Sequence, residues 1–496
     1  MKISIQKAKN GEDTATADGH FLHSNYAPSK EAQRFVENLK LPYAPKKIII
    51  LEPALSYAAD FFKVRFPEIK LGVIRYEKDF ALYNSKFDFV LNYFEHSDFS
   101  EYLEKVFAEE ELLSTVFISW PPSAQIFSKT ENEIWKAIKT AMERAKTLLI
   151  TRQYFEKKWL INSCHFLKNI RNTIWFDGKI EKDVLIISSG PSLKPYINFI
   201  CKNHDKFFII CLSSAISVCI KNNITPDLYM TTDGGFWAGE HLKKLLKNEI
   251  PVAMPAEAFC AKHLLQKLKV LPLIYGEGIS KQLTQASGIH FKMAVRNGTV
   301  SGTALLFASQ YFTKNIFMCG LDMASQKGFQ HTQPNELETN SSIFDNRIKN
   351  KETRLARSEL TNGSLDIYKN WFISNNLNLL NRNVFRLIEK SDRKNNLGWI
   401  KDIDLCELMN MIDKNCDESP DTKKSFFQQK PYHYDSIKLL SLFEQNNENE
   451  NWQQQLFPLD YVSLSHNNNN NEIKEKIENE WSNLKTKISG ILNENI

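Results

Sequence analysis

The chain lacks the apolar segments that define membrane and secreted proteins. Its longest uncharged apolar run, Phe207 to Ile220, has 14 residues, whereas a membrane-spanning helix needs roughly 20. The first twenty residues contain no apolar core of a secretory signal. These absences predict a cytoplasmic protein with no membrane span.

The cysteines and histidines lack the spacing of a metal site. None of the eight cysteines belongs to a C-x-x-C pair, and no H-E-x-x-H occurs, so buried reduced thiols are expected. One D-x-D pattern, Asp402-Ile-Asp404, is of the kind that some glycosyltransferases use to hold a metal. It lies far along the chain from the glycine-containing loops, and such a short pattern often arises by chance. We therefore predict no metal site.

A strong excess of one charge is also absent. The 63 Lys and Arg against 58 Asp and Glu give a net charge of +5 over 496 residues, and no basic run with interleaved aromatic residues appears. Nucleic acid is therefore not an expected partner. The 42% hydrophobic and 24% charged residues are typical of a globular protein, and the length indicates two or three domains.

What the sequence does contain is a series of short apolar runs that each end in small polar residues. Val184 to Ile187 is followed by Ser188-Ser-Gly-Pro-Ser192, and Phe207 to Cys211 is followed by Ser213 and Ser214. This pattern is typical of a doubly wound parallel sheet, in which ligands bind at the carboxyl ends of the strands. The amides of a glycine-containing turn at a helix start favour phosphate. The segment therefore predicts a nucleotide site.

Composition and periodicity predict three parts in an α/β protein. Residues 1–172 form a smaller α/β domain that ends in a long connecting helix, and no glycine fingerprint suggests a phosphate site there. Residues 173–412 form a Rossmann-like domain with a doubly wound, mostly parallel sheet. Residues 413–496 form a helical C-terminal region, with an asparagine-rich flexible linker before an amphipathic helix over Glu472 to Leu492.

Several motifs resemble known families. Gly190-Pro-Ser-Leu193 after a strand and Val300-Ser-Gly302 before a helix resemble the nucleotide loops of bacterial sialyltransferases. With Phe21-Leu-His-Ser24, Trp371-Phe372 and Val384 to Trp399, the chain resembles the motility accessory factor (Maf) family of flagellin glycosyltransferases over roughly residues 15–412. The central domain also resembles the 6-hydroxymethylpterin pyrophosphokinases.

The Maf resemblance implies transfer of a nonulosonic acid, of the pseudaminic or legionaminic type, from its CMP conjugate to Ser or Thr hydroxyls of flagellin. The CMP-sugar is a donor substrate, so no tightly bound cofactor is expected, and an oligomer is possible. The candidate nucleotide-binding residues lie in three loops: Ser189, Gly190, Pro191, Ser192, Leu193, Ser213, Ser214, Thr299, Ser301 and Gly302.

The candidate catalytic residues are His331, Asp322 and Asp233. A base must take the proton of the acceptor hydroxyl, and histidine fits this role near neutral pH. His331 belongs to a polar segment after Asp322 that we expect to be an irregular active-site loop. The related sialyltransferases have tyrosines in this loop that support the leaving phosphate. Here these tyrosines are absent, and Lys327 would supply the charge.

Other interpretations stay open. The protein could be an ATP- and Mg²⁺-dependent pyrophosphokinase in which Asp233 and Asp322 hold the metal, or a non-catalytic flagellin-binding module. The residues also have purely structural explanations: Gly190 and Asp233 in tight turns, Asp322 as a cap, and His331 as an exposed loop residue.

Overall fold

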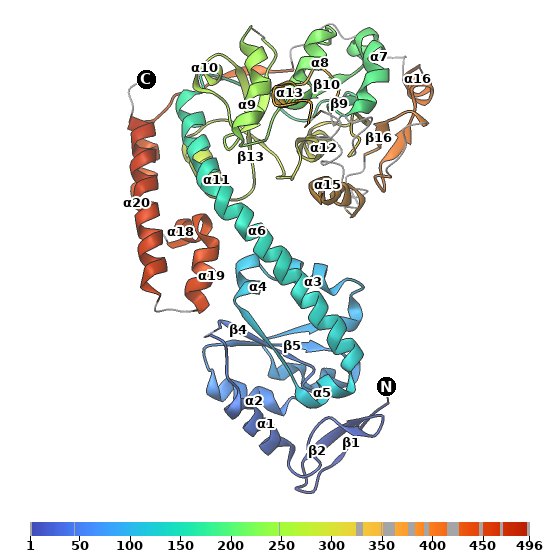
Figure 1. Cartoon of the computed structure of the whole chain (residues 1–496), viewed down its shortest axis with the longest axis vertical. Helices are drawn as coiled ribbons and strands as arrows, with labels where there is room; N and C mark the ends of the chain where they lie inside the picture. The colour runs from blue at the N-terminus through green and yellow to red at the C-terminus, as the bar shows by residue number, and fades with distance from the viewer. Residues whose placement is uncertain are drawn as a thin grey trace. The chain divides into compact units, whose positions relative to one another are not determined.

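The computed structural model describes residues 2–43, 45–247, 249–323, 331–348, 350, 363–374, 382–390, 396–413, 426–445, 450–466 and 470–493. The chain divides into two compact units. Unit 1 comprises residues 1–156 and 449–484, and unit 2 comprises residues 157–448 and 485–496. Figure 1 shows both, coloured along the chain. The domain ranges inferred from the sequence remain predictions.

Unit 1 contains a four-stranded parallel sheet with the order β6-β5-β4-β7. Its strands are β4 (Lys47–Leu51), β5 (Lys70–Arg75), β6 (Phe89–Asn92) and β7 (Thr115–Ser119). Its helices are α1 (Pro28–Asn38), α2 (Tyr57–Arg65), α3 (Phe99–Val106), α4 (Glu109–Leu113) and α5 (Pro121–Ile126). The strand β4 reads Lys-Ile-Ile-Ile-Leu because it pairs on both sides and is buried on both faces.

Unit 1 has two further parts, an antiparallel sheet that was not predicted and helices from the C-terminal region. A separate antiparallel sheet consists of β1 (Ile3–Lys7), β2 (Asp13–Ala17) and β3 (His20–Phe21). The C-terminal helices α18 (Glu450–Leu456), α19 (Pro458–His466) and part of α20 (Asn471–Asn493) also belong to this unit. The His466 ring stacks on Tyr43 with centroids 3.9 Å apart, which fixes α19 on the N-terminal part of the chain.

Unit 2 is built on an eleven-stranded sheet with the order β17-β16-β15-β9-β10-β11-β12-β13-β8-β18, and β14 also pairs with β13. Neighbouring strands are parallel except β18, which runs antiparallel to β8. The strands are β8 (Asn172–Trp175), β9 (Val184–Ile187), β10 (Phe208–Leu212), β11 (Leu228–Met230), β12 (Val252–Pro255), β13 (Lys269–Ile274), β14 (Lys292–Met293), β15 (Ile316–Cys319), β16 (Val384–Leu387), β17 (Lys401–Ile403) and β18 (Gln428–Pro431).

Helices lie between these strands. The described ones are α6 (Ser128–Asn169, which belongs to both units), α7 (Ile197–Lys202), α8 (Ile216–Lys221), α9 (Phe236–Leu242), α10 (Lys262–Leu265), α11 (Ile279–Ala286), α12 (Val300–Tyr311), α13 (Glu336–Ser342), α15 (Gly363–Ser374), α16 (Leu405–Asp413) and α17 (Ser436–Gln445). Alternate side chains of β9 and β10, such as Val184 and Ile210, pack with Leu305 and Ala308 of α12 in one core. The predicted α/β fold class, with a large, mostly parallel sheet and a helical C-terminus, is confirmed.

Some local predictions were wrong. The sequence pattern also predicts a helix over Asp402 to Ile412, but the helix begins only at Leu405, because residues 401–403 pair with β16 as strand β17. The supposed linker contains strand β18, which extends the sheet beside β8. Most of the helix predicted from Arg347 to Leu360, and the end of that predicted from Asp366 to Leu380, lie outside the described residues. No helix in the described ranges is both long and apolar enough to cross a membrane.

Candidate functional site

The strand order creates a topological switch point at the carboxyl ends of β9 and β15, the place where open α/β sheets form a ligand crevice. From β9 the sheet continues through β10 to β13 on one side, whereas β15 pairs with β9 on the other side. The loops that follow β9 and β10 in the chain therefore diverge from the loop that follows β15. In open α/β sheets such a switch point is where ligands bind.

The turns after β9 and β15 touch through their backbones. The amide of Gly190 donates to the carbonyl of Gly320 over 2.8 Å. A Cβ atom on Gly190 would lie 2.1 Å from Asp322 Oδ2, and Gly320 has φ +71° and no room for a side chain beside the Ser188 carbonyl. Both positions therefore require glycine. The Asp322 carboxylate accepts from the Ser192 amide at 3.0 Å, which places Asp322 as a clamp between the two turns.

Four amides of the Gly190 turn are engaged within the protein and are therefore not available to a phosphate. The amides of Ser188, Gly190 and Leu193 donate to backbone carbonyls, and that of Ser192 donates to Asp322. The turn instead offers hydroxyl groups. Ser192 Oγ is buried and has no hydrogen-bond partner among the described residues. Leu193 packs in the interior, in the short 3-10 helix Pro191–Tyr196.

The start of α12, unlike the Gly190 turn, has backbone amides that could bind an anion. Thr299 caps the helix, because its hydroxyl accepts from the Gly302 amide at 3.0 Å. Within the described residues, the backbone amides of Val300 and Ser301 have no hydrogen-bond acceptor. The Ser301 hydroxyl lies 3.1 Å from that of Ser188. The helix start and the turn after β9 are therefore adjacent.

Three side chains form a hydrogen-bonded chain at the crevice. Ser189 Oγ donates to Ser214 Oγ at 2.9 Å and lies 2.8 Å from His331 Nδ1. Since the Ser189 proton points to Ser214, Nδ1 of His331 must carry a proton and donate to Ser189. The other ring nitrogen, Nε2, then has a free lone pair. Burial lowers the pKa of His331 below its ordinary value, although nearby Glu338 opposes this shift. A neutral imidazole with Nε2 unprotonated is the form that a general base needs.

The segment after His331 is tied to the same turns. Thr332 donates through its amide to the Ser189 carbonyl at 2.6 Å and through its hydroxyl to the Gly190 carbonyl at 2.7 Å. The Asn335 side chain donates to the Ser214 carbonyl at 3.0 Å. The prediction of an irregular loop is therefore partly wrong, because helix α13 begins at Glu336. The Asn335 side chain accepts from the amides of Leu337 and Glu338 at its start. Lys327 lies outside the described residues.

Two other candidate residues, Asp233 and Ser213, lie at the same edge of the sheet. Asp233 follows β11, is exposed, and accepts from the Gly235 amide at 2.7 Å, so its carboxylate closes its own turn. Ser213 is buried in the short 3-10 helix after β10. The strands β9, β10 and β11 are parallel, so the turns with Ser192, Ser213 and Asp233 all lie at one edge. Among the described residues, no hydrogen bond links Asp233 to the chain formed by His331, Ser189 and Ser214.

A cluster of charged residues around Glu336, at the start of α13, was not predicted from the sequence. Glu336 accepts from Ser217, contacts Lys244 Nζ at 2.6 Å, and lies 2.9 Å from His241 Nδ1. Burial alone would raise the pKa of Glu336, but the hydrogen bonds from His241, Lys244 and Ser217 outweigh it and lower the pKa to about 2. These partners are far apart in the chain, and no spacing rule identifies such a cluster.

A second missed group fixes the loop before α12. The Arg296 guanidinium lies between the rings of Trp159 and Tyr275, 4.4 and 4.5 Å from their centroids, and donates to Glu257 at 2.9 Å. Burial raises the pKa of Glu257, and the charge of Arg296 opposes this shift. Arg296 directly precedes the Asn297 side chain that accepts from the Thr299 amide at 2.9 Å. The group therefore positions the start of α12.

The D-x-D pattern has structural roles. Both oxygens of Asp402 accept from the fully buried Arg386, at 2.7 and 2.6 Å. Asp404 accepts from the Glu407 amide at 2.9 Å and so caps α16. Over the described ranges, no group of three or more His, Cys, Asp or Glu side chains has the geometry to hold a metal ion.

Comparison with known proteins agrees with this architecture. Residues 157–328 match the model of a family described as 6-hydroxymethylpterin diphosphokinase MptE-like. An uncharacterized protein of Treponema pallidum (strain Nichols) is 28% identical over 271 residues, which cover 54% of this chain and 58% of that protein. A second uncharacterized protein of the same organism is 26% identical over 117 residues, which cover 23% of this chain and 54% of that protein. Both matches span less than two thirds of these relatives.

A solved structure shows the fold over nearly the whole chain. It is described as the structure of MAf glycosyltransferase from Magnetospirillum magneticum AMB-1, and it aligns with a TM-score of 0.54 over 99% of this chain and 91% of that chain, at 12% identity. Two of the resemblances seen in the sequence find support here: the chain has the fold of that Maf glycosyltransferase, and residues 157–328 match the MptE-like family model. At this identity the likeness establishes the fold and not the reaction.

The contact between the two turns gives a direct test. We expect Gly190→Ala to destabilise unit 2 by about 1–3 kcal/mol, because the new methyl group would collide with Asp322 and the Gly320 carbonyl. Urea denaturation, followed by hydrogen exchange at β9 and β15, measures the change. Gly276→Ala is the matched control, since nothing lies within 4 Å of its added methyl, and it should change stability by less than about 0.5 kcal/mol. Equal effects of the two variants would contradict the clamp.

Proposed function

We propose that this protein is a glycosyltransferase whose nucleotide-sugar donor binds in the crevice at the carboxyl ends of β9, β10 and β15. The observation that carries this proposal is the hydrogen-bonded chain from His331 through Ser189 to Ser214, beside the start of α12. It places a base, several hydroxyl groups and an anion-favouring helix end at one edge of the sheet. The fold shared with a Maf glycosyltransferase supports the same reaction class.

In this mechanism His331 acts as the general base. Its Nδ1 proton is directed to Ser189, so the tautomer is fixed and Nε2 accepts the proton of the attacking hydroxyl. Burial, which lowers the pKa of His331, keeps the ring neutral at physiological pH. The bond from the acceptor oxygen to the anomeric carbon forms while the bond from that carbon to the phosphate oxygen breaks.

The leaving nucleotide develops negative charge on its phosphate. The amides of Val300 and Ser301 point out of the first turn of α12 and, with the Ser301 and Ser188 hydroxyls, suit a phosphate at this place. In this proposal Ser192 and Ser214, in the turns after β9 and β10, contact the rest of the nucleotide. Because they offer hydroxyl groups and no charge, they fit a neutral base or a ribose.

The donor in this proposal is a CMP-linked nonulosonic acid, and the acceptor is a Ser or Thr hydroxyl of flagellin. Both are drawn from the Maf resemblance of the motifs from Phe21 to Trp399 and from the fold shared with a Maf glycosyltransferase. A cytoplasmic location follows from the same proposal, since the nucleotide-sugar donor is a cytoplasmic metabolite.

A pyrophosphokinase is the second candidate, favoured by the MptE-like match over residues 157–328. It needs ATP and Mg²⁺, with Asp233 and Asp322 as metal ligands. The geometry is less suited to it: one oxygen of Asp322 accepts from the Ser192 amide, and one oxygen of Asp233 accepts from the Gly235 amide. Both carboxylates would retain only part of their capacity for a metal.

Nucleotide titration separates these two candidates. Isothermal titration calorimetry of the full chain should show saturable binding of CMP without metal, and binding weaker by at least tenfold for ATP with Mg²⁺. Ser192→Ala should weaken CMP binding, because Ser192 Oγ is buried at the crevice without a protein partner in the described ranges. Tight binding of ATP with Mg²⁺ and none of CMP would instead support the pyrophosphokinase.

Removal of the base tests catalysis. We expect His331→Ala to lower sugar transfer by about 10²–10⁴-fold while leaving CMP affinity within threefold, because the ring acts on the acceptor. Mass spectrometry of co-expressed flagellin measures the product. His263→Ala, on an exposed site of α10, is the control and should keep full activity.

The pH profile tests the same base. The transfer rate should hold near pH 6.5 and fall only at lower pH, since a base works deprotonated and the pKa of His331 is lowered.

Unchanged flagellin modification by His331→Ala would exclude this mechanism, and modification that does not depend on His331 or Ser192 would favour the non-catalytic binding module.

A further inference from the structure

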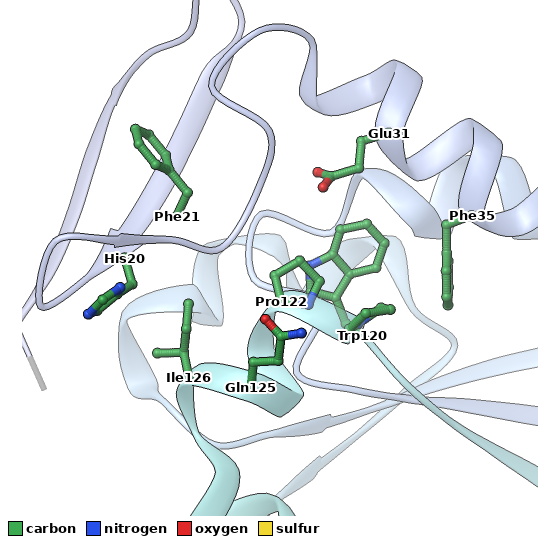
Figure 2. A pocket seen from close by; sticks show the side chains of 9 residues that line it. His20, Phe21, Glu31, Phe35, Trp120, Pro122, Gln125 and Ile126 are labelled. Atoms are coloured by element: carbon green, nitrogen blue, oxygen red, sulfur yellow. The ribbon is translucent and has the colours of Figure 1, made fainter.

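Unit 1 contains a cavity that the proposed reaction does not use. It has a volume of about 390 Å³ and lies among β3, α1 and the segment from Trp120 through α5. Figure 2 shows Phe21 and Phe35 at opposite sides, with the Glu31 carboxylate between them and Trp120 below. Its size is within the range of small-molecule sites.

Three aromatic rings, those of Phe21, Phe35 and Trp120, form part of the cavity wall. Trp120 is 1% exposed, and its indole nitrogen donates to the Leu22 carbonyl at 2.8 Å. Phe35 meets the Trp120 ring edge to face, with centroids 5.1 Å apart. Phe21, in contrast, is 40% exposed, which is unusual for a phenylalanine and leaves its ring accessible from solvent. Ring faces of this kind attract cations through their quadrupoles.

Glu31 supplies the charge of the cavity. Its Oε2 accepts from the Ser24 amide at 2.7 Å, which fixes the carboxylate, and among the described residues its Oε1 receives no hydrogen bond. No lysine or arginine lines the cavity, so no basic side chain there neutralises Glu31. A negative charge among aromatic rings therefore faces the cavity without a compensating cation.

A buried histidine, His23, lies next to the Glu31 carboxylate. His23 is 1% exposed, and its Nε2 accepts from the Leu55 amide at 3.1 Å, so the proton of the neutral ring is on Nδ1. That Nδ1 has no hydrogen-bond partner within the described ranges and lies 3.8 Å from Glu31 Oε2. It is too far away to donate a hydrogen bond to Glu31. The carboxylate thus keeps its capacity for a ligand.

We propose that this cavity binds an organic cation, an ammonium or guanidinium group such as the tip of a lysine or arginine side chain. The cation pairs with Glu31 while the rings of Phe21, Phe35 and Trp120 surround its alkyl part. An anion is disfavoured by Glu31. A neutral sugar would find few hydrogen-bonding side chains besides Gln125 and His20.

The test uses the full chain and three probes: Nα-acetyl-lysine amide, Nα-acetyl-arginine amide and Nα-acetyl-norleucine amide. Norleucine has the apolar chain without the charge. Saturation-transfer NMR titrations should show saturable binding of at least one cation, with the norleucine probe at least tenfold weaker. Comparison of the lysine and arginine probes separates an ammonium from a guanidinium site.

Matched variants assign the binding to this cavity. Glu31→Gln should weaken cation binding at least fivefold, because the amide still accepts from Ser24 but carries no charge. Glu37→Gln, at an exposed position of the same helix, should have no effect. Phe21→Ala should also weaken binding, and it provides the test if Glu31→Gln does not fold. Equal binding of the norleucine probe, equal binding by Glu31→Gln, or binding of a methyl glycoside in place of the cations would overturn the proposal.

Discussion

The structure of the crevice depends on one close contact, between the turns that follow β9 and β15. Strands of a sheet lie about 4.8 Å apart, so the turns at the ends of two paired strands share a space that leaves little room for side chains. Gly190 and Gly320 meet this constraint, and Asp322 joins the two turns through the Ser192 amide. This arrangement places Ser189 where it bridges Ser214 and His331.

This contact also divides the roles within the site. Four amides of the Gly190 turn donate within the protein and are not available to a phosphate. The amides of Val300 and Ser301, in the first turn of α12, have no acceptor in the described part of the chain. Arg296, held between Trp159 and Tyr275, fixes the loop from which α12 starts. The hydroxyls of Ser188 and Ser301 lie within hydrogen-bonding distance and so connect the turn after β9 to the start of α12. These contacts hold the loops of the proposed nucleotide site together.

The parts of this picture that were predictable from sequence follow from local rules. Apolar runs such as Val184 to Ile187, each ended by small polar residues, predict parallel strands, and the carboxyl ends of parallel strands meet at one edge. The contacts of Glu336 with Ser217, and the stacking of His466 on Tyr43, were not predictable. They join residues more than a hundred positions apart, and no periodicity specifies such pairs. The sheet β1–β3 was missed because it lacks an apolar run.

The most direct measurement for the account is hydrogen–deuterium exchange of the full chain with and without CMP. The account predicts slower exchange on CMP addition at residues 188–192, at residues 213–214 and at the start of α12 around Ser301, with no change at the cavity beside Glu31. Protection in other parts of the chain, with none in these three segments, would contradict a nucleotide site at this edge of the sheet.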